Sequence, residues 1–358
     1  GEGEGEMLSL LTFSLTLTPR ASSTPGFGSS LHLTSPPPRR SALGMAAPQY
    51  SAQAAAVVSS RPVSPNGASW LISLRALEHE IDYQPGHVLA VEVTPQGHEK
   101  TLKGPYTVTR SDTDQRTVDV IYRVIVDPPA SDSADHVESG PMRKTAAFKA
   151  LREGDENVSF GGKFKVPILE GISKDAKHVV LVTSGAGVGP CIGFVEQCVA
   201  AWAAGDEIAA PSVSLFAGYR NVGDIICEDE LDDLAARSGG RFSWSACLSS
   251  EGDASMQSGS APAGHSIIAG RTTTAAPPAI LKELASRGAA LDQTHFHLVG
   301  NGEMVSEWKE ALLTGASLAE ERVTIEMYFG HTSPAKAGAV AAISEALSAS
   351  KAPAGVAA

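Results

Sequence analysis

Residues 178–190, HVVLVTSGAGVGP, decide the fold of this chain. The run from 178 to 183 is continuously apolar and predicts a parallel strand that is covered on both faces. Glycines at 185, 187 and 189 form a turn, and Pro190 suits the first turn of a helix because no N–H is needed there. A strand, glycine turn and helix in this order indicate a nucleotide site, where free N–H groups face a diphosphate. A purely structural turn is the alternative.

The sequence downstream alternates between strand-like and helix-like segments. Strands are expected at 212–217, 242–247, 295–299 and 322–328, and helices at 191–204, 229–237, 278–287 and 304–313. Such alternation predicts a parallel, Rossmann-like sheet with helices on its faces, over residues 173–332. The Ala-rich and Ser-rich segment 333–358 is expected to be a weak helix or a tail.

The sequence upstream, 51–172, reads as short strands separated by turn-forming residues. Segments 88–93, 106–109 and 118–124 are rich in β-branched and aromatic residues, and only one helix, at 145–151, is suggested. Strands at this spacing predict a sandwich or a barrel.

Composition narrows the function. The net charge of -12 argues against a general nucleic-acid binder, and no run reaches the roughly 18 apolar residues of a membrane span. The four cysteines form no CxxC pair, so a disulfide framework, a bound metal and an iron–sulfur cluster are not expected.

The first segment predicts targeting. Residues 7–77 contain no Asp or Glu but carry arginines and many Ser and Thr, which is typical of an organelle transit peptide. We therefore expect 1–50 to be a disordered transit segment, with a plastid favoured over a mitochondrion. Residues 1–6 look like read-through before Met7. A disordered tail without an address is the alternative.

The proline after the glycines resembles the GxGxxP turn of the ferredoxin–NADP reductase family. Five further segments are similar to that family's motifs and follow in the same order. They are the barrel strand opening QPGH at 84–87, the flavin motif RxY(S/T) at 104–107, the diphosphate helix at 142–151, the CGxxxM segment at 299–304 and the ExY segment at 325–329. Segment 215–221 also resembles the family's second nucleotide-domain strand.

This resemblance, over about 55–330, implies an antiparallel Greek-key flavin-binding barrel followed by the nucleotide-binding domain. It implies FAD, with FMN as the alternative, and NADP, with NAD as the alternative. Tyr106 would lie against the isoalloxazine and Thr107 near its N5, while Glu326 and Tyr328 would close the nicotinamide side. Each could instead be an ordinary strand residue.

The resemblance implies three further groups of contacts, and Lys103 as an additional charge near the flavin. The flavin phosphates would be bound by Arg143, Lys144 and Thr145. The pyridine dinucleotide would be bound by Gly185, Gly187, Gly189, Pro190, Gly300 and Met304, and its 2′-phosphate by Arg220, Ser249 and Arg271.

Three positions depart from the family pattern: Gly104 replaces its arginine, Ala186 a Thr or Ser, and Val299 a Cys. Two functions therefore stay open. One is an NAD(P)H oxidoreductase passing hydride to flavin and electrons to a protein such as ferredoxin, or to the acceptor of a cytochrome b5 or flavodoxin reductase. The other is a non-catalytic nucleotide-binding or assembly subunit of a photosynthetic complex.

Overall fold

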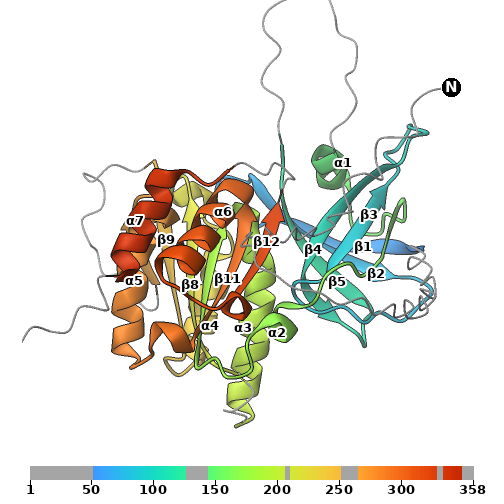
Figure 1. Ribbon diagram of the computed structural model, residues 1–358. Helices are drawn as coiled ribbons and strands as arrows, with labels where there is room; N and C mark the ends of the chain where they lie inside the picture. The colour runs from blue at the N-terminus through green and yellow to red at the C-terminus, as the bar shows by residue number, and fades with distance from the viewer. Residues whose placement is uncertain (1–50, 126–143, 206–209, 251–264, 329–333, 349–358) are drawn as a thin grey trace, which may run out of the picture. The chain divides into compact units, whose positions relative to one another are not determined.

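The structure, a computed structural model, describes residues 51–125, 144–205, 210–250, 265–328 and 334–348. They form a closed six-stranded barrel followed by a six-stranded parallel sheet with helices on both faces (Figure 1). Both parts of the predicted fold class are confirmed. The expected targeting segment, 1–50, lies outside the described residues, and so do Met142 and Arg143.

The barrel is antiparallel throughout, with strand order β1-β2-β5-β4-β3-β6. Its strands are β1 (Ala52–Pro62), β2 (Ser69–Ala76), β3 (Val88–Val93), β4 (Leu102–Asp112), β5 (Thr117–Arg123) and β6 (Val158–Gly161). Strand β4 extends further at both ends than predicted, because residues 102–105 pair with β3 and residues 110–112 pair with β5 despite weak strand propensity. Tertiary pairing therefore decided the bounds of this strand.

One short helix, α1 (Lys144–Ala150), closes the barrel core. Its Phe148 is fully buried among barrel residues that include Leu74, Val91 and Val120. The helix predicted at 145–151 is thus present, shifted by one residue.

The sheet has strand order β10-β9-β8-β7-β11-β12 and every neighbouring pair is parallel. The strands are β7 (His178–Ser184), β8 (Ser212–Tyr219), β9 (Phe242–Leu248), β10 (His265–Ala269), β11 (Thr294–Asn301) and β12 (Val323–Tyr328). The chain moves outward from β7 to β10 and then returns to β11 on the other side of β7. The carboxyl ends of β7 and β11 therefore form the switch point at which α/β sheets bind ligands.

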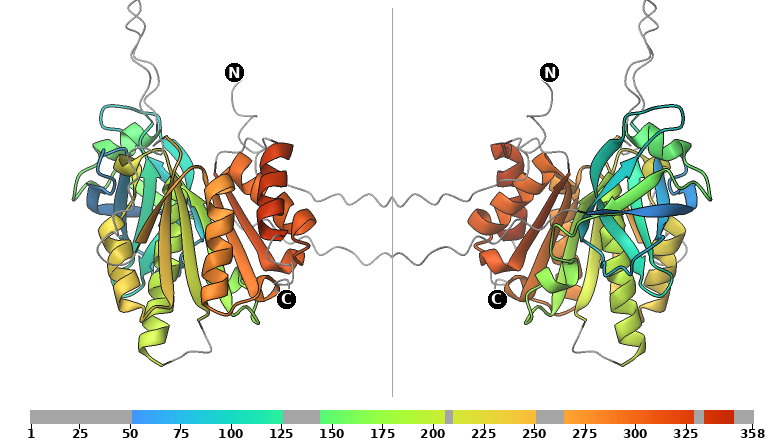
Figure 2. Two further views of the ribbon diagram at one scale, coloured as in Figure 1. Left: turned by 90° about the vertical axis from the view of Figure 1, so that its left-hand side faces the viewer. Right: turned by 90° about the vertical axis from the view of Figure 1, so that its right-hand side faces the viewer.

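Helices cover both faces of the sheet (Figure 2). Helices α3 (Val188–Ala203) and α4 (Glu228–Arg237) pack on one face. Helices α5 (Thr272–Ser286), α6 (Gly302–Glu310) and α7 (Ala337–Ser348) pack on the other. Helix α5 starts earlier than predicted, since two prolines that suggested a start lie inside it.

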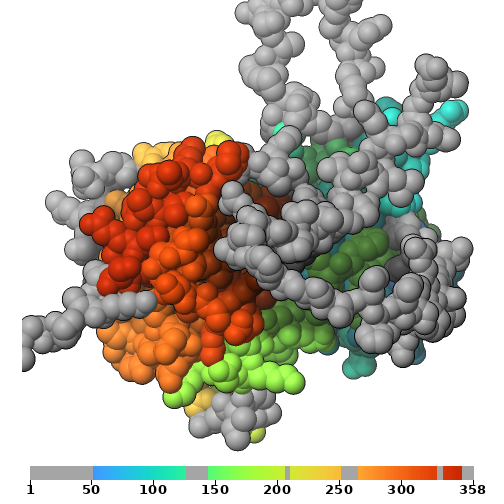
Figure 3. Space-filling view, in the orientation of Figure 1, coloured from blue at the N-terminus to red at the C-terminus, as the bar shows by residue number. Residues whose placement is uncertain are grey.

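Helix α7 occupies the segment for which a weak helix or a tail was expected. Its Ile343 and Leu347 are fully buried against the sheet-domain core. Lys336, just before it, pairs with Glu303 of α6 at 2.6 Å. Figure 3 shows α7 forming one surface with the neighbouring orange helices. The chain beyond β12 thus returns to the α5–α6 face of the sheet.

The cysteines and the helices add two plain findings. All four cysteines are free and buried, and burial raises the pKa of the Cys198, Cys227 and Cys247 thiols to about 12. Within the described ranges, no helix is both long and apolar enough to cross a membrane, and no cluster of three metal-ligating side chains occurs.

Candidate active site

Barrel strand β4 lies directly against the start of helix α3. A Cβ placed on Gly193 would lie 1.8 Å from the Thr109 carbonyl oxygen, and one on Gly189 would lie 2.8 Å from Thr109 Oγ1. Pro190, between them, is buried in the first turn of the helix. Gly189, predicted as a dinucleotide contact, therefore has a packing reason of its own, namely the approach of the barrel.

Within the glycine turn, Gly185 is surrounded by open space, unlike Gly187 and Gly189. Its φ of +53° lies in the left-handed region that favours glycine, and a Cβ there would meet nothing within 4 Å. A Cβ on Gly187 would instead lie 2.7 Å from the carbonyl oxygen of Val299. The turn is thus shaped by β11 on one side and is open at Gly185, where a ligand can approach its backbone.

Ser184 ties the carboxyl ends of β7 and β11 together. Its Oγ accepts a hydrogen bond from the Asn301 backbone N–H at 2.9 Å, and Asn301 in turn caps α6. Gly300, with φ of +133°, permits this contact, since a Cβ there would lie 2.3 Å from Ser184 Oγ. Sequence analysis missed Ser184, although a serine directly before the glycine turn is a usable signal. Met304 is buried in the core of the α5–α7 face.

Three predicted residues from the two parts of the fold meet beside this turn. Thr107 of β4 donates a hydrogen bond from its Oγ1 to Oε1 of Glu326 on β12, and both residues are buried. Glu326 also pairs in register with Val299 of β11. Tyr328 packs against the same core as Ala186. The structure therefore brings together Thr107, Glu326 and Tyr328 at the switch point of the sheet.

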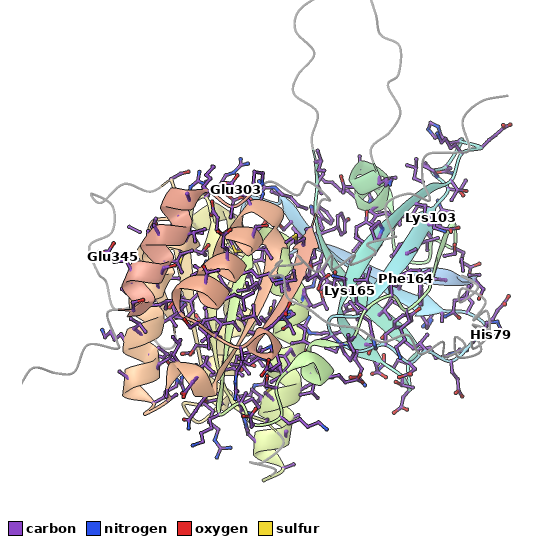
Figure 4. The ribbon with its side chains drawn as sticks, in the orientation of Figure 1. His79, Lys103, Phe164, Lys165, Glu303 and Glu345 are labelled. Atoms are coloured by element: carbon purple, nitrogen blue, oxygen red, sulfur yellow. The ribbon has the colours of Figure 1, made fainter. Side chains whose placement is uncertain are left out.

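The electrostatics of this cluster favour neutral groups. Burial raises the pKa of Glu326, while the Thr107 hydrogen bond and the charge of Lys165 act in the opposite direction. Burial also raises the pKa of Tyr328 well above its usual range, and the nearby Glu326 carboxylate adds to this effect. Figure 4 labels Lys165, which comes from the segment between β6 and α2 (Ile168–Gly171). Glu326 can therefore hold a proton at a higher pH than an exposed glutamate.

Tyr106 leaves the opposite face of β4, as neighbouring strand residues do. Its ring packs on that of Phe148, with centroids 4.8 Å apart and planes tilted by 35°. Burial raises its pKa. A Cβ on Gly104 would lie 3.2 Å from Tyr106 Cε2 and 3.4 Å from Lys144 Cδ. Tyr106 thus belongs to a second group, with Gly104 and Lys144, that is separated from Thr107 by the strand itself.

The other predicted flavin contacts lie elsewhere. Lys103, which Figure 4 labels on the barrel, is on the opposite face of β4 from Gly104. Its ammonium pairs with Glu92 at 2.9 Å. Thr145 accepts a hydrogen bond from the Ile125 backbone N–H at 3.0 Å, so its hydroxyl oxygen anchors the chain after β5. The geometry therefore does not favour Lys103 as the charge beside Gly104.

The three predicted 2′-phosphate contacts follow successive strands of the sheet. Arg220 and Ser249 come directly after β8 and β9, Arg271 comes two residues after the end of β10, and all three are exposed. Backbone hydrogen bonds from Ser249 to Tyr219 and from Gly270 to Leu248 hold these strand ends together. Neither arginine forms an ion pair with another residue in the part of the chain that the structure describes. Two arginines and a serine hydroxyl thus lie at the carboxyl ends of three neighbouring strands of the sheet.

Comparisons with known proteins agree with this arrangement. Residues 181–309 match the family model of the oxidoreductase NAD-binding domain. No curated protein matches the chain at a significant level. Among solved structures, ferredoxin–NADP+ reductase from Plasmodium falciparum is 15% identical, with a TM-score of 0.55, over 77% of this chain and 96% of that one. These identities show a shared fold.

Two larger proteins share the same fold. Cytochrome P450 reductase GcoB from Amycolatopsis is 17% identical, with a TM-score of 0.54, over 78% of this chain and 70% of that one. Flavohemoglobin from Malassezia yamatoensis is 13% identical, with a TM-score of 0.55, over 78% and 60%. The family model thus identifies residues 181–309 as similar to an oxidoreductase NAD-binding domain, and the solved structures share the two-part fold of barrel and sheet.

Proposed function

We propose that this protein is a flavin-dependent NAD(P)H oxidoreductase that exchanges electrons with a separate protein such as ferredoxin. The observation that carries the proposal is the hydrogen bond from Thr107 to the buried Glu326, beside the glycine turn. It joins a barrel hydroxyl to a carboxyl at the switch point, where α/β sheets bind ligands. Bound flavin would supply the hydride and electron chemistry, which side chains alone do not provide.

The residues present fit a flavin nucleotide. Gly185 offers open backbone for a dinucleotide, and the half-buried Tyr106 offers an aromatic surface. Glu326 would hold a proton on its carboxyl, since burial raises its pKa. The Thr107 hydroxyl, hydrogen-bonded to Glu326, would connect this carboxyl to the barrel. Tyr328 would exclude water from the same cluster.

NADP is the proposed nucleotide, with NAD as the alternative. Arg220, Ser249 and Arg271 support it, because guanidinium groups suit phosphate. The Plasmodium falciparum reductase has been solved with 2′P-AMP. Binding of 2′-phospho-AMP but not AMP to the full chain is expected, and equal binding of both would favour NAD.

The second candidate is a non-catalytic nucleotide-binding or assembly subunit of a photosynthetic complex. It is favoured by Gly104, Ala186 and Val299, which stand where the family has an arginine, a hydroxyl and a thiol. Such a protein would keep the fold and the glycine turn but would not reduce flavin.

Purification of the full chain separates the two candidates. The oxidoreductase would be yellow, would release FAD or FMN on denaturation, and would be bleached by NADPH without oxygen. Glu326→Gln should slow the bleaching about 10- to 100-fold if its carboxyl takes part in proton transfer. Glu310→Gln, at an exposed position of α6, is the matched control. A colourless chain that takes up no added flavin would contradict the enzyme.

A plastid location, stromal or at the thylakoid surface, is part of the same proposal. It is supported by the acid-free, Ser-rich composition of 7–77. A fluorescent protein fused after residue 77 should enter plastids, and cytosolic fluorescence would contradict the proposal.

A further inference from the structure

Two buried histidines of β11 are joined through one hydroxyl of β12. Phe296 packs on the α5–α7 face of the sheet, so its neighbours His295 and His297 leave the opposite face, which α3 covers. His295 Nε2 lies 2.9 Å from Thr324 Oγ1, and the same oxygen lies 2.8 Å from His297 Nδ1. These three residues, His295, Thr324 and His297, form a continuous polar column, called the histidine column below.

The backbone of Ser173 sets the direction of the hydrogen bonds in the histidine column. The Ser173 N–H donates to His295 Nδ1 at 3.2 Å, and its hydroxyl, 3.1 Å from that nitrogen, donates to the Glu321 carbonyl oxygen at 2.6 Å. Because His295 Nδ1 accepts, the proton of the neutral ring is on Nε2 and is donated to Thr324. The Thr324 hydroxyl then donates to His297 Nδ1. This order leaves the proton of His297 on Nε2.

His297 therefore carries a buried donor of fixed direction. Burial lowers the pKa of His297 to about 3, and the charges of His295 and Lys165 act in the same direction, so the ring stays neutral. The side chain is only 6% exposed, and its Nε2 meets no hydrogen-bond acceptor among the residues that the structure describes. A buried N–H without an acceptor costs free energy. This donor thus indicates an acceptor that reaches it in another state of the site.

The Glu326 carboxyl lies one step further along the same face of the sheet. Glu326 follows Thr324 by two residues in β12, and its register partner Val299 follows His297 by two residues in β11. His297 and Glu326 are therefore diagonal neighbours, with Cβ atoms roughly 7 Å apart, which is within the combined reach of the two side chains. The charge of Lys165 acts on the pKa of both residues, so they also share a neighbour.

We propose that His297 is a positioning residue for Glu326, and that its Nε2–H donates a hydrogen bond to the Glu326 carboxylate once that group has given up its proton. The inference rests on the proposed function, in which Glu326 holds a proton, and it deepens that function. Thr107 binds Oε1 of the carboxyl, and His297 binds Oε2. The histidine column keeps His297 in the tautomer that donates, since the other tautomer would turn a lone pair toward the carboxylate and repel it.

The other groups that face Glu326 act differently from His297. Burial raises the pKa of Tyr328 in the same strand and of Cys191 in α3, and the Glu326 carboxylate adds to both effects, so these groups stay neutral beside it. Lys165, from the segment before α2, is a cation, but it is exposed and its charge is screened by water and salt. His297 offers a neutral donor in a dry setting, where a hydrogen bond to a carboxylate is stronger than in water.

The pKa of Glu326 in the full chain, with flavin removed, tests this role. NMR of ¹³C-labelled glutamate carboxyls gives this pKa, and the signal is assigned by its loss in Glu326→Gln. His297→Phe should raise the proton affinity of Glu326 about tenfold or more, because a hydrogen bond to the charged form is lost. His297→Gln should restore the original value, since its amide can accept from Thr324 and donate to Glu326.

His178→Phe is the matched control. His178 is also buried, bonds Ser212 at 2.7 Å, and leaves the α5–α7 face of the sheet with Val180. Its replacement should leave the pKa of Glu326 unchanged. In the unmodified chain, ¹⁵N NMR should show the His297 proton on Nε2, a measurement that needs no variant to fold.

The outcomes separate the inference from the proposed function. If the pKa of Glu326 is the same in His297→Phe and His178→Phe, or if the His297 proton is on Nδ1, the inference fails while the proposed function stands. If His297→Phe raises the pKa as expected but NADPH does not bleach the flavin-loaded chain, the hydrogen bond stands and the proposed function fails. A melting curve for each variant shows whether it is folded.

Discussion

The two ends of strand β4 show two different uses of glycine. At its far end, the Thr109 carbonyl oxygen lies against Gly193 of α3 and the Thr109 hydroxyl lies against Gly189, with no room for a Cβ at either glycine. At its near end, Gly104 lies under Tyr106 and Lys144, at ordinary or slightly tight contact distances. Gly193 is required by a backbone carbonyl that cannot move aside, whereas a Cβ on Gly104 would meet only flexible side chains. The tight end holds the barrel on the sheet, and the loose end is where this chain departs from the flavin motif that it resembles.

The largest expected effect comes from a substitution that disrupts the tight contact between β4 and α3. Gly193→Ala should lower the free energy of unfolding by about 4 kcal/mol or more, because its Cβ would overlap the Thr109 carbonyl oxygen at 1.8 Å. Gly338→Ala, in α7 with nothing within 4 Å, is the control and should be neutral or stabilising. Urea unfolding measures both, and equal stability of the two variants would refute this account of the contact.

The next largest effect concerns the ion pairs of Arg110, the residue after Thr109 in β4, with helices α3 and α4. Arg110 of β4 bonds Glu196 of α3 at 2.7 Å and Glu230 of α4 at 2.6 Å, and it is largely shielded from water. Arg110→Met should cost about 3 kcal/mol, since Glu196 loses its cation and Glu230 keeps only its pair with Arg61 at 2.8 Å.

The exposed pair Arg237–Asp233 offers the matched control for Arg110. Arg237→Met should cost less than about 0.5 kcal/mol, because water already screens that pair. Thermal melting at low and high salt would check both variants. A cost for Arg110→Met no larger than that for Arg237→Met would show that the barrel is held by packing alone.

Acid should weaken the sheet. Burial lowers the pKa of His178 and His295 to about 4 and that of His297 to about 3. The unfolded chain takes up these protons below about pH 6.5 and the folded chain does not, so stability present above pH 6.5 is lost as pH falls toward 4. Each histidine should contribute about 2 kcal/mol of this loss by pH 5. Urea unfolding at pH 7, 6 and 5 measures it, and a flat profile would contradict it.

The smallest expected effect on the free energy of unfolding is that of a substitution at Gly104, at the loosely packed end of β4. Gly104→Ala should cost less than about 1 kcal/mol, because the Tyr106 ring and the Lys144 stem can move by a few tenths of an ångström. Hydrogen exchange of β4 would show the change as local. A cost approaching that of Gly193→Ala would mean that Gly104 is also fixed by backbone.

The sequence predicted most of what depends on local pattern. The apolar run of β7 and the turn at Gly185 predicted the parallel sheet, since a strand buried on both faces must be apolar throughout. The resemblance assigned Thr107, Glu326 and Tyr328 to the surroundings of one flavin ring, and Thr107 and Glu326 hydrogen-bond although 219 residues separate them along the chain. The bounds of β4 and α5 were not predictable, because partner strands and packing overrode weak propensities.

By itself, the sequence determined the order of barrel and sheet, the glycine turn and the absence of a strand arginine at position 104. Only the tertiary structure decided that Lys103 pairs with Glu92, that Ser184 joins β7 to β11, and that Lys144 lies over Gly104. These contacts join residues whose spacing along the chain carries no periodic signal. They depend on which face of a strand each side chain leaves and on how closely two backbones approach, and packing sets both.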